Sequence, residues 1–160
     1  GPRWHLLFAT IIGTGRRIGE LLALTWDDVQ LNHDVPHLYL THTKSRRAQY
    51  VPLGSSLREL WAAAVIDGLP PIPRHTGRSP ELHPFPFHYE AARQRWNGML
   101  TKLAIPHRSM HKNRHTLATR LILEGKPLGG VSMLLGHSST TTTERFYSDV
   151  TALEWAHLLP

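Results

Sequence analysis

The segment Thr14-Gly15-Arg16-Arg17-Ile18-Gly19-Glu20-Leu21 decides how the first part of the chain folds, because it separates two apolar stretches. Residues 4–12 are apolar and predict a helix that ends at the glycines near this segment. Leucines at helical spacing predict a second helix over residues 17–24, with Glu20 near its first turn. The sequence therefore places Arg17 at the start of a helix, directly after a break.

A small sheet and a series of helices are predicted downstream. Strands are expected at residues 29–31, 37–41 and 49–53, and a polar hairpin joins the last two. Residues 68–86 are rich in proline and predict an extended loop without regular elements. Further helices are predicted at residues 56–66, 89–103, 110–123, 127–135, 140–147 and 151–159. The expected fold class is α+β, mainly α-helical with a small three-stranded antiparallel sheet.

The length of the chain fits one compact domain, because single domains cluster at roughly 100 to 150 residues. We therefore predict a single domain over residues 1–160. Gly1-Pro2 resembles the scar left when a protease removes a tag, and an apolar helix follows at once. We expect the chain to be the C-terminal part of a longer protein.

The composition predicts a polyanionic partner. The chain has 18 Lys and Arg against 12 Asp and Glu, a net charge of +6 and a pI near 10.2, which favours nucleic acid or an anionic membrane surface. No apolar stretch approaches the roughly 18 residues of a membrane-spanning helix, and no signal segment opens the chain, so nucleic acid is the better candidate. The chain contains no cysteine, which excludes disulfides and thiol nucleophiles. Any catalysis must use oxygen or imidazole.

Two arginines are candidates for a metal-free phosphate site. The charge on the non-bridging oxygens of a phosphodiester grows when a nucleophile attacks, so planar cationic donors stabilise the reaction. Arg17 opens a predicted helix, and Arg114 lies in the run His111-Lys112-Asn113-Arg114-His115. His111 and Arg114 are three residues apart and would share a face of a helix. Either arginine taken alone is more simply a solvated surface residue, and only the fold decides whether they meet.

Lys44, His137 and Tyr147 become candidates when they are considered with these arginines. Lys44 lies in the predicted hairpin, and His137 follows a glycine suited to cap a helix. Tyr147 lies on the polar side of the pair Phe146-Tyr147 and could present its phenol to a substrate. The ordinary alternatives are a surface lysine, a capping histidine and a core or interface tyrosine.

A zinc site is a competing interpretation of His111, His115 and His137. The first two histidines have the spacing of zinc ligands on a helix. The acidic residue expected between such histidines is missing, because Lys112-Asn113-Arg114 occupies these positions. Cations there argue against a divalent metal.

In this order, the segments resemble the catalytic domain of the tyrosine recombinases, the phage integrase family. Residues 14–21 resemble the family's Thr-Gly-x-Arg-x-x-Glu-Leu segment, which assigns Arg17 rather than Arg16 as the first catalytic arginine. Lys44 precedes Val51 by seven residues, as the family's hairpin lysine does. Each motif alone is weakly specific, whereas five motifs in the right order are strongly specific.

The C-terminal motifs complete the resemblance. Residues 111–116 resemble the second arginine box, and residues 134–137 resemble the box that follows. Many members carry their tyrosine nine residues after this last histidine, but that position is Phe146, which has no hydroxyl. Tyr147, ten residues after His137, is therefore the expected nucleophile. The catalytic residues that the resemblance implies are Arg17, Lys44, His111, Arg114, His137 and Tyr147.

The resemblance implies a site-specific recombinase or integrase that uses neither metal nor ATP nor any other cofactor. Tyr147 would attack a DNA phosphate to give a 3′-phosphotyrosyl link and a free 5′-hydroxyl, and the arginines would stabilise the charged transition state. The expected partners are double-stranded DNA attachment sites of a phage or other mobile element, and a homo-tetramer on DNA. The isolated domain is expected to be a monomer in the bacterial cytoplasm, away from membranes, and to lack the family's N-terminal core-binding domain.

Two other functions stay open from the sequence. A type IB topoisomerase uses similar arginine, lysine, histidine and tyrosine chemistry, but it relaxes DNA by letting one strand swivel. A DNA-binding module without catalysis would use the same basic residues only to hold phosphates. The short length and the integrase-like motifs favour recombination.

Overall fold

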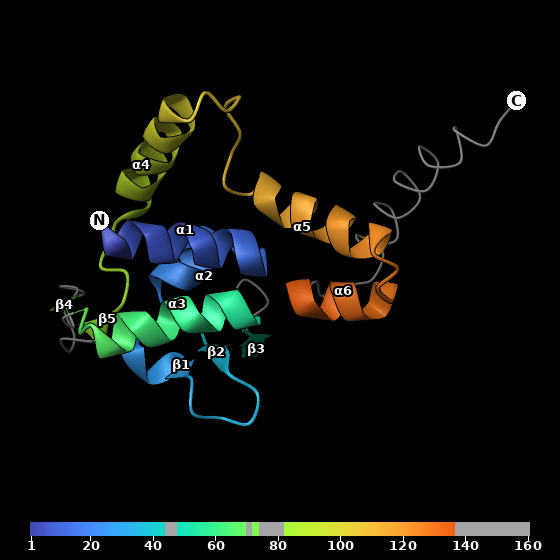
Figure 1. Ribbon diagram of the computed structural model, residues 1–160, viewed down its shortest axis with the longest axis horizontal. Helices are drawn as coiled ribbons and strands as arrows, with labels where there is room; N and C mark the ends of the chain where they lie inside the picture. The colour runs from blue at the N-terminus through green and yellow to red at the C-terminus, as the bar shows by residue number, and fades with distance from the viewer. Residues whose placement is uncertain (44–47, 70–71, 74–81, 137–160) are drawn as a thin grey trace, which may run out of the picture.

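The computed structural model describes residues 1–43, 48–69, 72–73 and 82–136. Its elements form a mainly helical molecule with a small sheet (Figure 1). The expected fold class, α+β with a three-stranded antiparallel sheet, is confirmed. Helices predicted at residues 140–147 and 151–159 lie outside the described residues. In the described part of the chain, no helix is long and apolar enough to cross a membrane.

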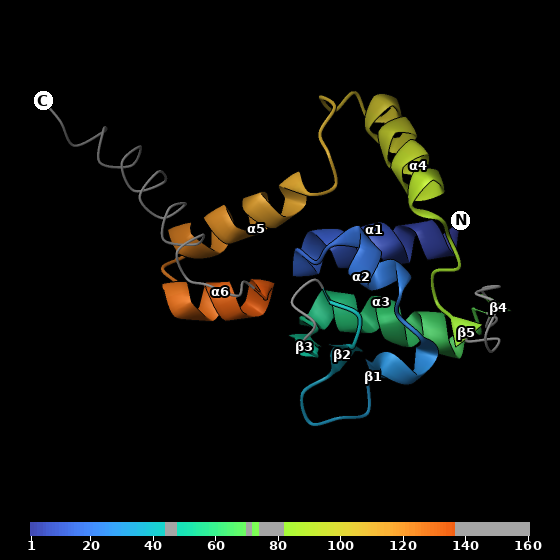
Figure 2. The same ribbon diagram turned by 180° about the vertical axis from the view of Figure 1, so that it is seen from behind.

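Helix α1 (Pro2–Thr14) lies at the centre of the described fold. It begins earlier than predicted, because a proline at the first helical position needs no hydrogen-bonded N–H group. Its buried side chains include Leu7 and Ile11, and it contacts helix α3 (Ser55–Ile66) and helix α5 (Lys112–Leu123). Figure 2 shows the same arrangement from behind, with α5 beyond the C-terminal end of α1.

A short helix and the predicted sheet follow α1. Helix α2 (Ile18–Leu22) is shorter than predicted, and a 3-10 turn, η1 (Trp26–Asp28), leads into strand β1 (Val29–Gln30). Strands β2 (His37–Leu40) and β3 (Gln49–Pro52) complete an antiparallel sheet in the order β1-β2-β3. Leu38 pairs with Val51 in register, and both side chains are fully buried. Leu38 and Leu40 are buried, whereas Tyr39 and its partner Tyr50 are more exposed, and a shift of one residue would reverse these faces.

The prediction that residues 68–86 lack regular elements is wrong. Strands β4 (Ile72–Pro73) and β5 (Leu82–His83) pair as a second, two-stranded antiparallel sheet. The imidazole Nδ1 of buried His83 donates a hydrogen bond to the carbonyl oxygen of Leu24 at 2.8 Å. Phe85 is fully buried, with its ring centroid 5.5 Å from that of Trp61. These tertiary contacts hold the segment, and proline content alone does not predict them.

The described residues form two apolar clusters. The larger cluster contains residues of α1, α2, α3, the three-stranded sheet and helix α4 (Tyr89–Lys102). The smaller cluster lies between α5 and helix α6 (Leu128–Leu135). Gly15 joins the two, because a side chain at this position would approach Leu135 Cδ2 at 2.8 Å and Leu117 Cδ2 at 3.1 Å. The close approach of the turn after α1 to both helices therefore requires glycine.

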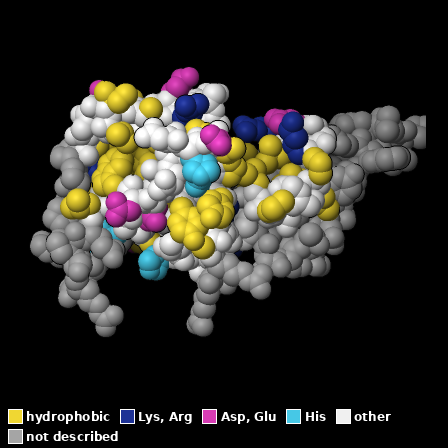
Figure 3. Space-filling view, turned by 90° about the horizontal axis from the view of Figure 1, so that it is seen from below, with side chains coloured by type: hydrophobic (Ala, Val, Ile, Leu, Met, Phe, Trp, Pro, Cys, Tyr) yellow, Lys and Arg dark blue, Asp and Glu magenta, His cyan; other side chains and the backbone are white. Residues whose placement is uncertain are grey.

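The surface is not uniformly basic. Figure 3 shows the molecule from below Figure 1, with apolar side chains and histidines over the centre of the face. Described Lys and Arg side chains are few there and lie along its upper edge.

Candidate active site

The turn between α1 and α2 positions the first candidate arginine. Gly15 caps α1 in the left-handed conformation (φ 62°), and Arg17 caps the N-terminus of α2 with extended backbone. The carboxylate of Glu20 accepts a hydrogen bond from Arg17 Nη1 at 3.1 Å and another from the Arg17 backbone N–H at 3.2 Å. Glu20 is 5% exposed, whereas the Arg17 side chain is 34% exposed. Glu20 therefore orients a guanidinium that still reaches the surface.

The second candidate arginine comes from α5 and meets the same turn. Arg114 is buried and its Nη1 donates a hydrogen bond to the carbonyl oxygen of Gly15 at 3.3 Å. Burial, together with the positive charges of Arg17 and Arg16, lowers the pKa of Arg114 to about 10, and Glu20 opposes this shift. The fold thus brings together three guanidinium groups and one carboxylate. Their excess positive charge suits an anion such as a phosphate.

A cavity of about 450 Å³ opens beside this cluster. Its lining includes the predicted residues Arg17 and His111, which caps the N-terminus of α5. It also includes His42, Tyr89 and Ser109, which the motifs did not identify. His42 precedes the hairpin lysine by two residues, and this position is only weak evidence in the sequence that His42 reaches the site. Nothing in the sequence around Tyr89 and Ser109 indicates that they line the cavity.

Three of the six predicted catalytic residues are described. Arg17 and His111 line the cavity and Arg114 is bonded to the turn that precedes Arg17, whereas Lys44, His137 and Tyr147 lie outside the described residues. His115 lines a different cavity with Arg108 and Lys112, and burial lowers its pKa, assisted by the charges of Arg114 and Lys112. The described residues contain no group of three or more His, Asp or Glu side chains that could hold a metal ion.

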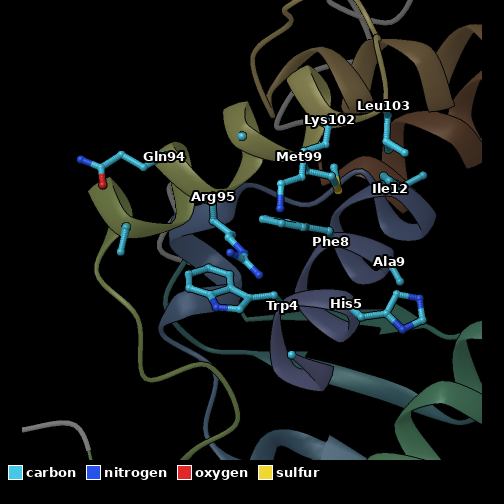
Figure 4. A pocket seen from close by; sticks show the side chains of 13 residues that line it. Trp4, His5, Phe8, Ala9, Ile12, Gln94, Arg95, Met99, Lys102 and Leu103 are labelled. Carbon is cyan, nitrogen blue, oxygen red and sulfur yellow. The ribbon is translucent and has the colours of Figure 1, made fainter.

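A larger cavity of about 910 Å³ lies between α1 and α4, and its lining contains none of Arg16, Arg17 and Arg114. Figure 4 shows side chains of the two helices facing each other across it. Trp4, Phe8 and Ile12 line it from α1, and Met99 lines it from α4. No predicted catalytic residue contributes to its lining. The smaller cavity is therefore the candidate active site, because the charged groups converge there.

Comparisons with known proteins identify the family. The model of the phage integrase family matches residues 3–154. The chain is 30% identical over 153 residues to tyrosine recombinase XerC of Bacillus subtilis strain 168, covering 90% of this chain and 48% of the relative. Tyrosine recombinase XerD of Pasteurella multocida is 29% identical, with 96% and 51% covered. The chain thus spans about half the length of these curated relatives.

A solved structure has the same fold. XerH site-specific recombinase, bound to a palindromic difH substrate in a post-cleavage complex, superposes with a TM-score of 0.77 at 23% identity. The match covers 98% of this chain and 45% of that chain. The resemblance to tyrosine recombinases inferred from the motifs is confirmed: the chain belongs to the phage integrase family.

Proposed function

We propose that this protein is the catalytic part of a site-specific DNA recombinase that cuts and rejoins strands through a 3′-phosphotyrosyl intermediate. The observation that supports this most directly is that Arg17, which lines the cavity, and Arg114, which is buried and bonded to the turn beside it, come together from segments far apart in the sequence. Two planar cations at this turn suit a phosphate whose negative charge grows during attack.

In the proposed reaction, the hydroxyl of Tyr147 releases its proton to solvent, and its oxygen attacks the phosphorus atom and forms the new P–O bond. The bond from phosphorus to the 5′-oxygen breaks, Lys44 supplies the proton for that oxygen, and a 5′-hydroxyl results. A 5′-hydroxyl of the partner strand then attacks the phosphotyrosine and releases Tyr147. The covalent link conserves the energy of the phosphodiester, so ATP is not consumed.

The remaining residues of the proposed set act on the phosphate. Arg17 and Arg114 stabilise the pentavalent state, while His111 and His137 donate hydrogen bonds to its oxygens. Glu20 positions Arg17 through the two hydrogen bonds described above. The two arginines together outweigh this one carboxylate, so positive charge remains to stabilise the transition state.

The wider assignments also belong to this proposal. The substrate is double-stranded DNA at attachment sites of a phage or other mobile element, and the protein works as a homo-tetramer on DNA in the bacterial cytoplasm. The names of its relatives support recombination: XerC and XerD are tyrosine recombinases, and XerH was crystallised with its difH substrate. We further propose that residues 1–160 form a single catalytic domain.

The test is covalent capture of DNA without metal. The protein is incubated in EDTA with a pool of nicked duplexes of randomised sequence, and denatured protein–DNA adducts are recovered and sequenced. We expect an adduct and an enriched DNA site with wild type, and no adduct with Tyr147→Phe. No adduct with wild type, or an adduct that persists in Tyr147→Phe, would contradict the proposal.

The same preparation distinguishes a topoisomerase from a recombinase. A recombinase should join strands between two duplexes that carry the recovered site. A topoisomerase should instead relax supercoiled plasmids that lack the site and give no exchange. Site-independent relaxation without strand exchange would therefore favour the type IB alternative.

A further inference from the structure

Arg16 is an arginine that the motifs left without a role, although it precedes the first candidate catalytic arginine. Its side chain is buried, at 3% exposure, and Nη2 donates a hydrogen bond to the carbonyl oxygen of Leu134 at 2.7 Å. Nη1 donates to the side-chain oxygen Oε1 of Gln49 on β3. One guanidinium therefore links the turn after α1, the edge strand β3 and the end of α6.

Arg16 binds the carbonyl group of Leu134, which lies in the last turn of α6. The last four carbonyl groups of a helix lack intrahelical donors, and Leu134 is the second-last residue of α6. The backbone N–H of Gly136 is directed toward the carbonyls of Met133 and Ser132, and Arg16 satisfies that of Leu134. A cation at this end also interacts favourably with the helix dipole.

Gly136, at the end of α6, packs closely against Arg16 and Gln49. It caps α6 in the left-handed conformation (φ 68°), and a Cβ atom there would lie 2.6 Å from Arg16 Nη1. The same Cβ would also collide with the side chain of Gln49. Arg16 thus occupies the space that a side chain at position 136 would need. The guanidinium and the glycine together fix the point at which the chain leaves α6.

The burial of Arg16 is costly, which argues against a role in stability alone. Burial lowers the pKa of Arg16, with Glu20 opposing this shift and Arg17 adding to it. Its Nε atom is buried and makes no hydrogen bond within the described part of the chain. Replacing a buried charged group together with its partner by apolar side chains often leaves stability unchanged or higher. A charged side chain at this place therefore calls for another explanation.

We propose that Arg16 is a positioning residue that fixes the C-terminal end of α6, and hence the start of the segment carrying His137, relative to Arg17. This inference rests on the proposed function, because it gives His137 a part in strand cleavage. Arg16 also lines the candidate cavity, but its Nη1 and Nη2 atoms donate to Gln49 and to the backbone of α6, so we assign it to positioning rather than to contact with the phosphate. The motif position before the catalytic arginine thereby connects two parts of the proposed active site.

The test is a double-mutant cycle on the rate of covalent adduct formation with a nicked duplex carrying the recovered site. Arg16→Met, His137→Ala and the double variant are compared with wild type. We expect Arg16→Met to lower the rate by about tenfold or more in the wild-type background and by less than about twofold in the His137→Ala background. Arg93→Met removes an exposed arginine of α4 and should leave the rate unchanged.

The outcomes separate this inference from the proposed function. Equal fold losses from Arg16→Met in both backgrounds, or no loss in either, would overturn the positioning role while wild-type cleavage still supports a recombinase. No effect of His137→Ala would overturn it as well, together with the assignment of His137. Absence of any wild-type adduct would instead contradict the proposed function.

A second variant covers the possibility that Arg16→Met does not fold. Arg16→Lys keeps the charge but replaces the two-pronged donor by a single ammonium group. We expect a smaller loss than for Arg16→Met, and again only when His137 is present. Melting temperatures and circular dichroism spectra of all variants establish that folded proteins are compared. A loss for Arg16→Lys that is the same without His137 would overturn the inference.

Discussion

Arg114 lies where a positive charge suits the binding of a phosphate but is unfavourable for the stability of the folded protein. Its pKa is lowered to about 10 because it is buried beside Arg17 and Arg16. Keeping the cation in this place therefore costs free energy, and an anion bound close to it would offset that cost. The sequence identified Arg114 from its motif, but the cost depends on neighbours that come from a different part of the chain.

We expect Arg114→Met to abolish strand cleavage while changing the free energy of unfolding by less than about 1 kcal/mol, because relief of the buried charge offsets the loss of its hydrogen bond to Gly15. Urea denaturation and adduct formation measure the two effects. Arg120→Met on the same helix removes an exposed arginine and should change neither. A large loss of stability in Arg114→Met would show that its hydrogen bond to Gly15 outweighs the burial of charge.

Arg17 should contribute more to cleavage than to binding. We expect Arg17→Ala to slow adduct formation by about 100-fold or more, and to weaken DNA binding by less than about tenfold, because the strongest interaction forms in the transition state. Adduct kinetics and fluorescence anisotropy measure the two quantities. Arg93→Ala, on the exposed face of α4, serves as the control. Parallel losses of binding and cleavage would make Arg17 an ordinary phosphate contact.

Among the secondary-structure elements, Gly15 lies in the turn where the two apolar clusters come into contact. We expect Gly15→Ala to lower the free energy of unfolding by about 2 kcal/mol or more, because the left-handed backbone and the contact with Leu135 leave no room for Cβ. Gly130→Ala is the matched control, since a Cβ there meets no atom within 4 Å. It should raise stability by about 0.5 to 1 kcal/mol through helix propensity. Equal effects at the two glycines would contradict this account.

Some helices and strands of this fold are determined by local sequence patterns and could be predicted, whereas others depend on tertiary contacts. Apolar periodicity predicted α1, α3, α4, α5 and α6, and alternation predicted the three-stranded sheet. Strands β4 and β5 were missed, because the anchors in that segment are a hydrogen bond from His83 to Leu24 and the burial of Phe85 against Trp61. Motifs likewise identified Arg17 and His111. They did not identify Tyr89, which reaches the same cavity only because α4 folds back toward α2.

At the scale of the whole molecule, the net charge of +6 favours binding to DNA. We expect the affinity for duplex DNA to fall at least about tenfold between 50 and 200 mM salt, because cations bound to the phosphates are released when the protein binds. A plot of log affinity against log salt concentration measures the number of phosphates contacted. The slope for Arg17→Ala should be smaller by about one contact. A flat dependence would contradict a binding surface built on Lys and Arg.

The central claim is that Tyr147 attacks DNA beside Arg17 and Arg114. Tyr89 is the alternative candidate for the nucleophile, because it is exposed and lines the same cavity as Arg17. The most direct measurement is mass spectrometry of the trapped adduct after proteolysis and nuclease digestion, which identifies the tyrosine that carries the nucleotide. We expect a nucleotide joined to Tyr147 through its 3′-phosphate. Attachment to Tyr89, or to any other residue, would contradict it.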